Sequence, residues 1–349
     1  MTVALQSSTL AGDQDSRRNA RSSGTARYVA TKVLGSAGSL AFVLVFNFFL
    51  FRVLPGDPAK VLTRNRYVPA DQVANLRRSF GLDKPLPEQF LSYVRNTLTG
   101  DLGISYKYRQ PVSEVIADRI WPTLLLVGLS TVLAAVIGLR IGVRAAWNRG
   151  SRFDRFATGT TVTLYAMPEF WLGILLIVTF SVGIGPLPGI FPTGGMNTAG
   201  VDASSWAGFL DVSEHLVLPV LTLTLAYLAE YALVMRSSLI DEMGSDYLVT
   251  ARAKGLRDAM VRRRHAVPNA LLPAVTLVVL NLGFVVSGAI TVETVFSWPG
   301  LGLLSYEALR VPDFPLLQGV FLLFSSGVIV ANLVGDLLYG VLDPRVRQA

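Results

Sequence analysis

Carboxylates inside long apolar runs are the residues of this sequence with the clearest capacity for chemistry. Glu169 follows Pro168 in one such run, and Glu230 lies within another. An ionisable side chain at membrane depth costs about 2.5–3.5 kcal/mol or more, so each needs a physical reason. One interpretation is that Glu169 and Glu230, with Asn281 and Glu293, face a water-filled pathway and meet an amino group there. The alternative is that they form helix–helix hydrogen bonds, with the carboxyl groups protonated.

Other kinds of site are excluded by the residues that the sequence lacks. It has no cysteine, which rules out a disulfide, a thiolate metal site and a cysteine nucleophile. His215 and His265 are its only histidines, too few for a histidine-rich metal site. The patterns G-x-x-x-x-G-K-[ST], G-x-S-x-G and H-E-x-x-H are all missing. We therefore predict no catalytic residue, no metal site and no cofactor bound by this chain.

Composition places the chain in a membrane. It is 51% hydrophobic and only 16% charged, with a mean hydropathy of +0.48, whereas soluble proteins carry about 25% charged residues. The charges cluster between long apolar runs, which is typical of a polytopic membrane protein. The net charge of +7 is explained by Lys and Arg in cytoplasmic loops rather than by nucleic-acid binding, because no binding motif is present.

The apolar runs predict an all-α fold with about six transmembrane helices. A spanning helix needs about 20 apolar residues to cross about 30 Å of hydrocarbon. Residues 1–30 are polar and are predicted to be a disordered cytoplasmic tail, and residues 343–349 form a short C-terminus. The predicted spans are residues 31–54, 120–147, 155–183, 214–236, 270–295 and 316–342.

Orientation follows from the distribution of Lys and Arg. These residues are frequent in the tail, in the links after the second and fourth spans and at the C-terminus, whereas residues 185–213 have none. Both termini are therefore predicted to be cytoplasmic. The long segment 55–118 is expected outside despite its basic residues, because long loops translocate largely regardless of charge. Helical spacing at residues 71–80 and 86–98 predicts a small helical extracytoplasmic insertion there.

The cytoplasmic loop at residues 237–269 is too long for a simple turn between helices. It is amphipathic and basic, and Gly255 stands where a helix from about Asp246 to Lys254 would end. Such a helix, with Ala251 and Ala253 expected on one face, would dock into a groove of another protein. From the residues alone, an interfacial helix lying on anionic lipid is equally compatible.

The stretch from Thr250 to Leu256, TARAKGL, resembles the coupling loop of ABC importer permeases, and specifically the B-type subunit of the dipeptide/oligopeptide branch. The branch pattern continues with Arg264-His265-Ala266 and with NALLP, although Pro268 replaces the usual arginine. Further matching stretches occur in order along the chain. They are LPGDPA at 54–59, GDLGIS at 100–105, Pro168 with FWLG at 170–173, VETVFSWPGLG at 292–302, and NL, DLLY and LDPR between 332 and 345.

This resemblance implies a type I ABC importer permease fold in the cytoplasmic membrane of a prokaryote. It also implies a division of labour with other chains: a second homologous permease subunit, ATP-binding subunits that hold ATP and Mg, and an extracytoplasmic substrate-binding protein. The loop residues implied to couple to the ATPase are Asp246, Tyr247, Thr250, Ala251, Arg252, Ala253, Lys254, Gly255, Leu256 and His265.

The sequence disfavours two other function classes. A secondary transporter or channel would show inverted repeats with interrupted helices, and no such symmetry is visible in the sequence. A membrane-bound enzyme would need a catalytic constellation, which is missing. The substrate stays open, because the same branch resembles permeases for dipeptides, longer peptides, nickel chelates and some sugars.

Overall fold

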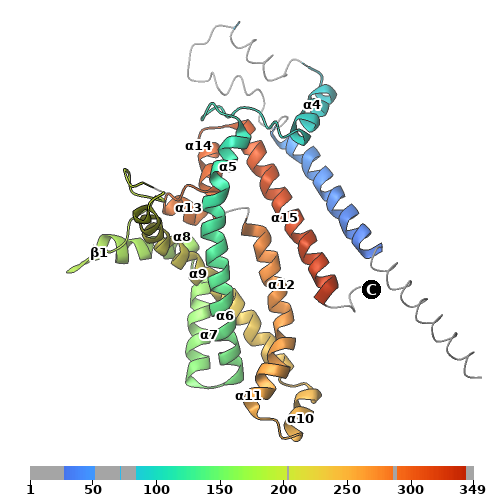
Figure 1. The fold of residues 1–349 in the computed structure, drawn as a ribbon, viewed down its shortest axis with the longest axis vertical. Helices are drawn as coiled ribbons and strands as arrows, with labels where there is room; N and C mark the ends of the chain where they lie inside the picture. Colours follow the sequence, from blue (N-terminus) through green and yellow to red (C-terminus); the bar gives the residue numbers. More distant parts are fainter. Residues whose placement is uncertain (1–26, 52–70, 72–83, 203, 286–288, 343–349) are drawn as a thin grey trace, which may run out of the picture.

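The computed structural model describes residues 27–51, 71, 84–202, 204–285 and 289–342. This part of the chain is mostly helical, which confirms the all-α fold class (Figure 1). One short antiparallel pair, β1 (Gly183–Ile184) and β2 (Leu187–Pro188), interrupts the helices. The first described helix begins at Arg27, inside the predicted tail; residues 1–26 and 343–349 lie outside the described residues.

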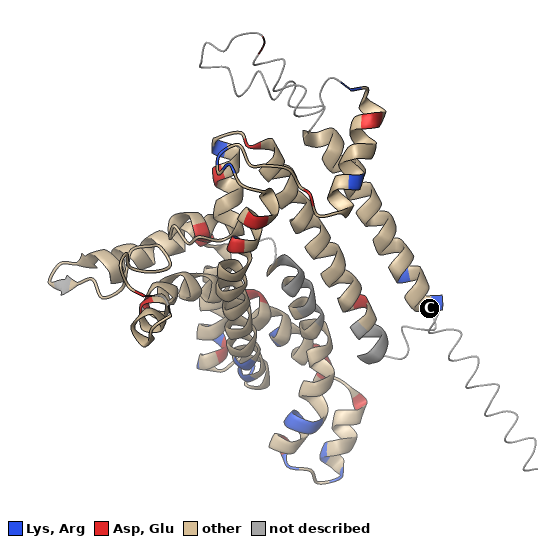
Figure 2. Ribbon diagram, turned by 45° about the horizontal axis from the view of Figure 1, so that its top comes forward, with Lys and Arg blue, Asp and Glu red and all other residues tan. Residues whose placement is uncertain are grey.

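Four helices of the described residues are long and apolar enough to cross a membrane, and a bent pair would supply a fifth. Figure 2 shows that Lys, Arg, Asp and Glu gather mainly near helix ends and in the connecting segments. The polytopic character expected from the sequence is therefore confirmed. The four helices are Arg27–Phe51, Val112–Trp147, Trp206–Glu242 and Phe314–Leu337, and the bent pair is Arg152–Ala166 with Glu169–Val182.

The second of these helices contains a change of winding. It consists of α5 (Val112–Thr123), the π-helix η1 (Leu124–Gly128) and α6 (Leu129–Trp147). Pro122 has no N–H to donate to the helical ladder, and the π-helical turn follows directly after it. The span thereby stays continuous from Val112 to Trp147.

The continuous helix predicted over residues 155–183 is wrong. α7 (Arg152–Ala166) and α8 (Glu169–Leu176), the latter continued by η2 (Ile177–Val182), meet at a bend of 104°. Met167 is extended, with φ −82° and ψ 130°, which is the conformation favoured before a proline. Pro168 therefore separates two helices, and Glu169 is the first residue of α8 rather than a residue inside a long helix.

The fourth and fifth predicted spans also differ from the structure. α9 (Trp206–Glu242) extends beyond the predicted residues 214–236 at both ends, and the Ser205 hydroxyl caps it by accepting the Gly208 N–H at 3.0 Å. The predicted span 270–295 is divided into α12 (Val267–Val285) and the short α13 (Ile290–Val295). Ala289, the residue before α13, lies outside the helical region, with φ −109° and ψ 79°.

Among the described helices, α6 and α9 share the most extensive contact, and their backbones approach closely. A Cβ on Gly138 would lie 2.6 Å from the carbonyl oxygen of Leu228, and a Cβ on Gly142 would lie 2.6 Å from that of Ala232. The two glycines are four residues apart and share one helix face, as in the G-x-x-x-G pattern of membrane helix pairs. The backbones can approach this closely because neither glycine carries a side chain.

The insertion that the sequence predicts at residues 55–118 is described in part. α4 (Leu86–Leu98) covers the second predicted helix of the insertion, whereas the first, at residues 71–80, lies outside the described residues except for Asp71. α4 packs against the N-terminal helix Arg27–Phe51 (Figure 1). The rings of Phe48 and Phe90 are 5.2 Å apart, and Asn47 Nδ2 donates to the Tyr93 hydroxyl at 3.1 Å.

The chain that follows α4 is fastened to α14 (Leu301–Arg310) and to the start of α15 (Phe314–Leu342). The buried carboxylate of Asp313 accepts the Ser105 hydroxyl at 2.6 Å and the Lys107 N–H at 3.0 Å. Glu307 lies nearby and pairs with the Lys107 ammonium at 2.7 Å, while accepting the Tyr108 hydroxyl at 2.5 Å. These bonds hold the segment that follows α4 on the end of the helical bundle.

This fastening should depend on acid pH. Burial raises the pKa of Glu307, but the Lys107 ammonium and the Tyr108 hydroxyl outweigh it, so the pKa is lowered overall. A lowered pKa in the folded state means that the stabilisation is complete above the ordinary value of about 4.3 and is lost as pH falls through the folded value.

We therefore expect Glu307→Gln to lower the melting temperature of the purified protein at pH 7. The difference from the unmodified protein should shrink as the pH falls below about 4.3 and vanish once the pH is below the lowered pKa of Glu307 in the folded protein. Because both partners are about one-third exposed, the loss should stay below about 1 kcal/mol. Glu88→Gln, an exposed position on α4, is the control and should change nothing. A difference that stays constant down to the lowest pH would contradict this assignment.

Candidate functional site

The predicted coupling loop forms a compact helical unit. It contains α10 (Asp246–Ala253), α11 (Asp258–Val261) and the π-helix η3 (Arg262–Ala266), which continues into α12. α10 ends in a Schellman motif, in which the N–H of Gly255 bonds to the Arg252 carbonyl at 2.9 Å and that of Leu256 to the Ala251 carbonyl at 3.4 Å. Gly255 has φ +76°, a conformation that glycine adopts without steric cost. The predicted helix stop is confirmed.

One face of α10 is seated on the bundle. Leu248 is fully buried and Ala251 is 6% exposed, and both pack in a cluster with Met235 and Leu239 of α9 and Val261 of α11. The opposite face is exposed, and it carries the remaining predicted coupling residues of the helix and its end. They are Asp246, Tyr247, Thr250, Arg252, Ala253, Lys254 and Gly255.

The expectation that Ala251 and Ala253 share a face is wrong. Residues two apart on an α-helix are separated by about 200°, so Ala251 points into the bundle while Ala253 is exposed. Ala251 therefore packs α10 onto the bundle, and its contact with an ATPase subunit stays a prediction. Any partner would contact the charged face that Arg252 and Lys254 occupy.

Trp147, the last residue of α6, connects this unit to the rest of the protein. Its indole Nε1–H donates to Asp258 at 2.8 Å. The guanidinium groups of Arg252 and Arg262 lie 6.0 Å and 5.9 Å from its ring centroid, within the range of cation–π attraction. A displacement of α10 and α11 would therefore also move the end of α6.

A second polar connection involves Tyr247. Its hydroxyl donates to the Glu242 carboxylate at the end of α9 and accepts the Asn269 amide of α12 at 2.8 Å. The same hydroxyl lies 3.2 Å from the backbone carbonyl of His265. Burial, followed by the Glu242 carboxylate, raises the pKa of Tyr247, so the phenol stays protonated and keeps donating. The coupling unit is thus tied to α9 and α12 as well as to α6.

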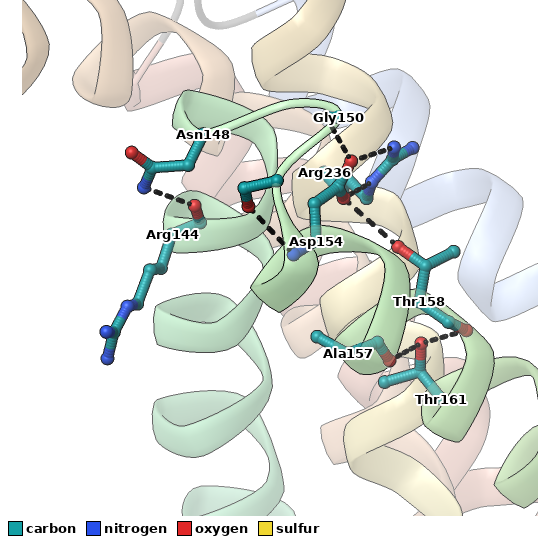
Figure 3. A network of polar contacts seen from close by, with 9 residues as sticks. Arg144, Asn148, Gly150, Asp154, Ala157, Thr158, Thr161 and Arg236 are labelled. Carbon is teal, nitrogen blue, oxygen red and sulfur yellow. Dashed lines mark hydrogen bonds and ion pairs between the residues drawn. The ribbon is translucent and has the colours of Figure 1, made fainter.

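The sequence analysis did not predict an ion pair that joins the C-terminal part of α9 to α7. Arg236 of α9 donates two hydrogen bonds to the buried carboxylate of Asp154 in α7, from Nε at 2.7 Å and from Nη2 at 3.0 Å (Figure 3). Asp154 also accepts the Gly150 N–H at 2.9 Å, and its own N–H donates to the Ser151 hydroxyl at 3.1 Å. The S-x-x-D spacing of Ser151 and Asp154 is a capping signal that the sequence offered; the pairing with Arg236 had no sequence signal.

The candidate pathway residues are brought partly together. Asn281 Nδ2 of α12 donates to the Tyr231 hydroxyl at 3.1 Å and lies 3.5 Å from the Glu230 carboxylate. Glu169 accepts the hydroxyl of Thr291 at 3.4 Å. Tyr227, which the sequence reasoning missed, lies close enough to Glu169 and Glu230 to interact with their charges. Its position three residues before Glu230 places both on one face of α9.

Glu293 differs from the other candidates, because it is completely buried. Its carboxylate accepts the Thr123 hydroxyl at 3.0 Å and the Leu303 N–H at 3.0 Å. Nearby, the buried indole of Trp298 donates to the Pro122 carbonyl at 2.9 Å. These hydrogen bonds join α13 and α14 to α5. The place of Glu293 in the pathway stays a prediction.

Within the described ranges, no group of three or more His, Asp or Glu side chains is arranged to hold a metal ion. The geometry instead describes an apolar helical bundle with half-buried carboxylates inside it and a braced, charged helical unit at one end. Such an arrangement suits the movement of a solute and the transmission of a force.

Comparisons with known proteins agree with this arrangement. Residues 138–348 match the family described as binding-protein-dependent transport system inner membrane component, and residues 25–127 match the N-terminal part of such membrane components. The chain is 39% identical over 319 residues to the dipeptide transport system permease protein DppB of Escherichia coli (strain K12), covering 88% of this chain and 94% of that protein.

A second group of relatives is named for a different substrate. The chain is 40% identical over 320 residues to the glutathione transport system permease protein GsiC of Salmonella typhimurium, covering 92% of this chain and 98% of that protein. The apolar helices and these relatives together indicate a multi-pass protein of the inner membrane with a transport role rather than an enzymatic one. The chain belongs to the family of binding-protein-dependent transport system inner membrane components, the permease subunits of ABC importers.

Proposed function

We propose that this chain is the pore-forming permease subunit of an ATP-driven importer that moves di- and oligopeptides inward across the cytoplasmic membrane. The observation that carries the proposal is the seating of α10. Its apolar face is buried on the bundle through Leu248 and Ala251, while Arg252 and Lys254 are exposed beyond it. A helix that is anchored on one face and exposed on the other can transmit a movement from a neighbouring protein to the bundle.

The partners follow from this assignment. A second homologous permease subunit would complete the pathway, and ATP-binding subunits with ATP and Mg would contact α10 from the cytoplasm. A substrate-binding protein would deliver the peptide from outside. In this orientation both termini are cytoplasmic, and α4 and α14 lie on the outer side.

The contacts around α10 suggest how the force would spread. A movement of α10 would pull on α6 through Trp147, on the end of α9 through Tyr247 and Glu242, and on α12 through Asn269. The Asp154–Arg236 pair would make α7 move with α9. Tightly packed elements shift as units between discrete arrangements. A movement of α10 that is transmitted through these contacts would therefore shift the helices together between inward-open and outward-open states.

The half-buried carboxylates favour a peptide substrate. Dipeptides and glutathione, the substrates named for two relatives, both carry an ammonium group. Glu169 and Glu230 would supply opposite charge in a partly dehydrated pathway, where such an attraction is stronger than in water. Tyr227 and Asn281 would add hydrogen-bonding groups beside them.

The overall proposal is tested by purifying the chain with its partner subunits and measuring ATPase stimulation across a peptide library with saturating binding protein. We expect stimulation by short peptides with a free amino terminus. A preparation that is fully active in transport without any ATP-hydrolysing partner would contradict the proposal.

The role of the carboxylates is tested separately. We expect Glu230→Gln and Glu169→Gln each to lower the uptake of a dipeptide into proteoliposomes by about tenfold or more, because each removes a charge-assisted hydrogen bond. Glu214→Gln, at an exposed position on α9, is the control and should leave uptake unchanged. If both pathway variants transport every peptide at the normal rate, the carboxylates serve helix packing instead.

A further inference from the structure

An open groove lies between the last turns of α6 and the start of α12. It has a volume of about 530 Å³ and is lined on one side by Val143 of α6 and on the other by Val267 and Leu271 of α12. Three arginines also line it: Arg140 and Arg144 from α6, and Arg262 from η3. The groove therefore combines an apolar surface with a concentrated positive charge.

The positive charge of the groove has no compensating carboxylate within the part of the chain that the structure describes. None of the three guanidinium groups there forms an ion pair. Arg144 instead lies over the Phe153 ring at 4.5 Å and Arg262 near the Trp147 ring at 5.9 Å. Figure 3 shows the Arg144 side chain extending away from the Asp154–Arg236 pair.

The spacing of the arginines adds electrostatic repulsion to this uncompensated positive charge. Arg140 and Arg144 are four residues apart, so they share one face of α6 and repel each other. An anion bound between them would turn this repulsion into two attractions. Because an arginine guanidinium matches the geometry of a phosphate group in a bidentate manner, a phosphate is the anion that fits best.

The position of the groove decides which phosphate compound would fill it. The groove lies where the apolar span Val112–Trp147 ends, which is the depth of lipid headgroups. A free phosphate would contact the arginines but leave the surface formed by Val143, Val267 and Leu271 uncovered. A phospholipid would satisfy both parts, and basic pockets between membrane helices are known to bind anionic headgroups.

We propose that this groove binds an anionic phospholipid from the adjoining leaflet, with its phosphate on Arg140, Arg144 and Arg262 and an acyl chain along Val143, Val267 and Leu271. Such a lipid bridges α6 to η3, the segment that leads from the coupling unit into α12. The proposal does not depend on the transported substrate, so its test is independent of the test of transport.

The test uses the full chain in nanodiscs of phosphatidylcholine with a minor share of phosphatidylglycerol. Native mass spectrometry then counts the phosphatidylglycerol molecules retained on the protein. Replacing one groove arginine should weaken retention about fivefold, and the triple variant Arg140→Gln, Arg144→Gln, Arg262→Gln roughly a hundredfold. Arg140→Gln alone removes an exposed side chain and keeps the test valid if the triple variant fails to fold.

The matched control is the triple variant Arg149→Gln, Arg152→Gln, Arg155→Gln, which removes the same charge from exposed positions near the α6–α7 turn. It should retain phosphatidylglycerol normally, and glycerol phosphate in solution should not displace the lipid. If both triple variants lose phosphatidylglycerol equally, the retention depends on overall surface charge and not on the groove, and the proposal is overturned. It would also be overturned by displacement with glycerol phosphate, or by a photo-crosslinker at Val143 that captures a partner subunit and no lipid.

Discussion

Replacing Gly255 with glutamate is expected to leave the protein folded in the membrane while lowering ATP-driven uptake at least about tenfold. Gly255 closes the Schellman motif of α10 with φ +76°, and an L-residue in this conformation costs roughly 1–2 kcal/mol. A Cβ there would meet no atom within 4 Å, so the substitution strains α10 without disturbing the bundle. The added carboxylate would also lie on the exposed face that the proposal assigns to the ATPase, beside Arg252 and Lys254.

The measurements are the yield of membrane-inserted protein, the melting temperature and the rate of ATP-driven peptide uptake. We expect the first two to stay near normal and the third to fall at least about tenfold, which corresponds to about 1.4 kcal/mol of lost coupling. Gly255→Asn should retain most of the uptake, because asparagine tolerates this backbone conformation.

Gly200 provides a matched control for that variant. It has φ +89°, and a Cβ there would also meet nothing within 4 Å, but it lies in the segment between β2 and α9 rather than in α10. Gly200→Glu should therefore transport normally. Full uptake by Gly255→Glu, or an equal loss in Gly200→Glu, would show that α10 is not needed for coupling.

Enlarging Gly142 is expected to have the largest effect on folding. A Cβ at this position would lie 2.6 Å from the Ala232 carbonyl oxygen and 2.8 Å from the Met235 Cβ, so Gly142→Leu would force α6 away from α9. Overpacking of this kind typically costs about 1–3 kcal/mol, and the separation would also strain the nearby Asp154–Arg236 pair. We expect a lower melting temperature and a lower yield of monodisperse protein after solubilisation.

Gly128 is the control on the same span. A Cβ there would meet nothing within 4 Å, so Gly128→Leu should keep the melting temperature within about a degree or two of normal. Gly138→Leu should behave like Gly142→Leu, because its Cβ would meet the Leu228 carbonyl oxygen at 2.6 Å. A Gly142→Leu protein as stable as the Gly128→Leu protein would show that α6 and α9 do not pack as described.

The coupling segment illustrates which features local sequence can specify. The end of α10 was predictable because Gly255 is suited to the left-handed conformation that closes a helix. The face that α10 buries was not, because a basic helix of eight residues fits lipid and protein partners equally well. The packing of Leu248 and Ala251 on α9 and α11 shows which face of α10 is buried.

The carboxylates also show which features local sequence specifies and which only the tertiary structure reveals. Apolar context marked Glu169, Glu230 and Glu293 as unusual, and that signal was sound because a charge in an apolar segment always needs a compensating partner. The partners themselves come from other helices. Glu293 is satisfied by Thr123 and Leu303, whereas Glu169 and Glu230 lie half-buried near Tyr227.

By itself the sequence determined that the chain is helical, apolar and polytopic, since hydropathy and helix stops depend on residues close together in the chain. Its ordered motifs also determined the family. The tertiary structure alone decided that Pro168 bends a span by 104°, that Asp154 braces Arg236, and that three arginines line one groove. These features join residues from different helices, and their free energies depend on distances and burial that no local pattern contains.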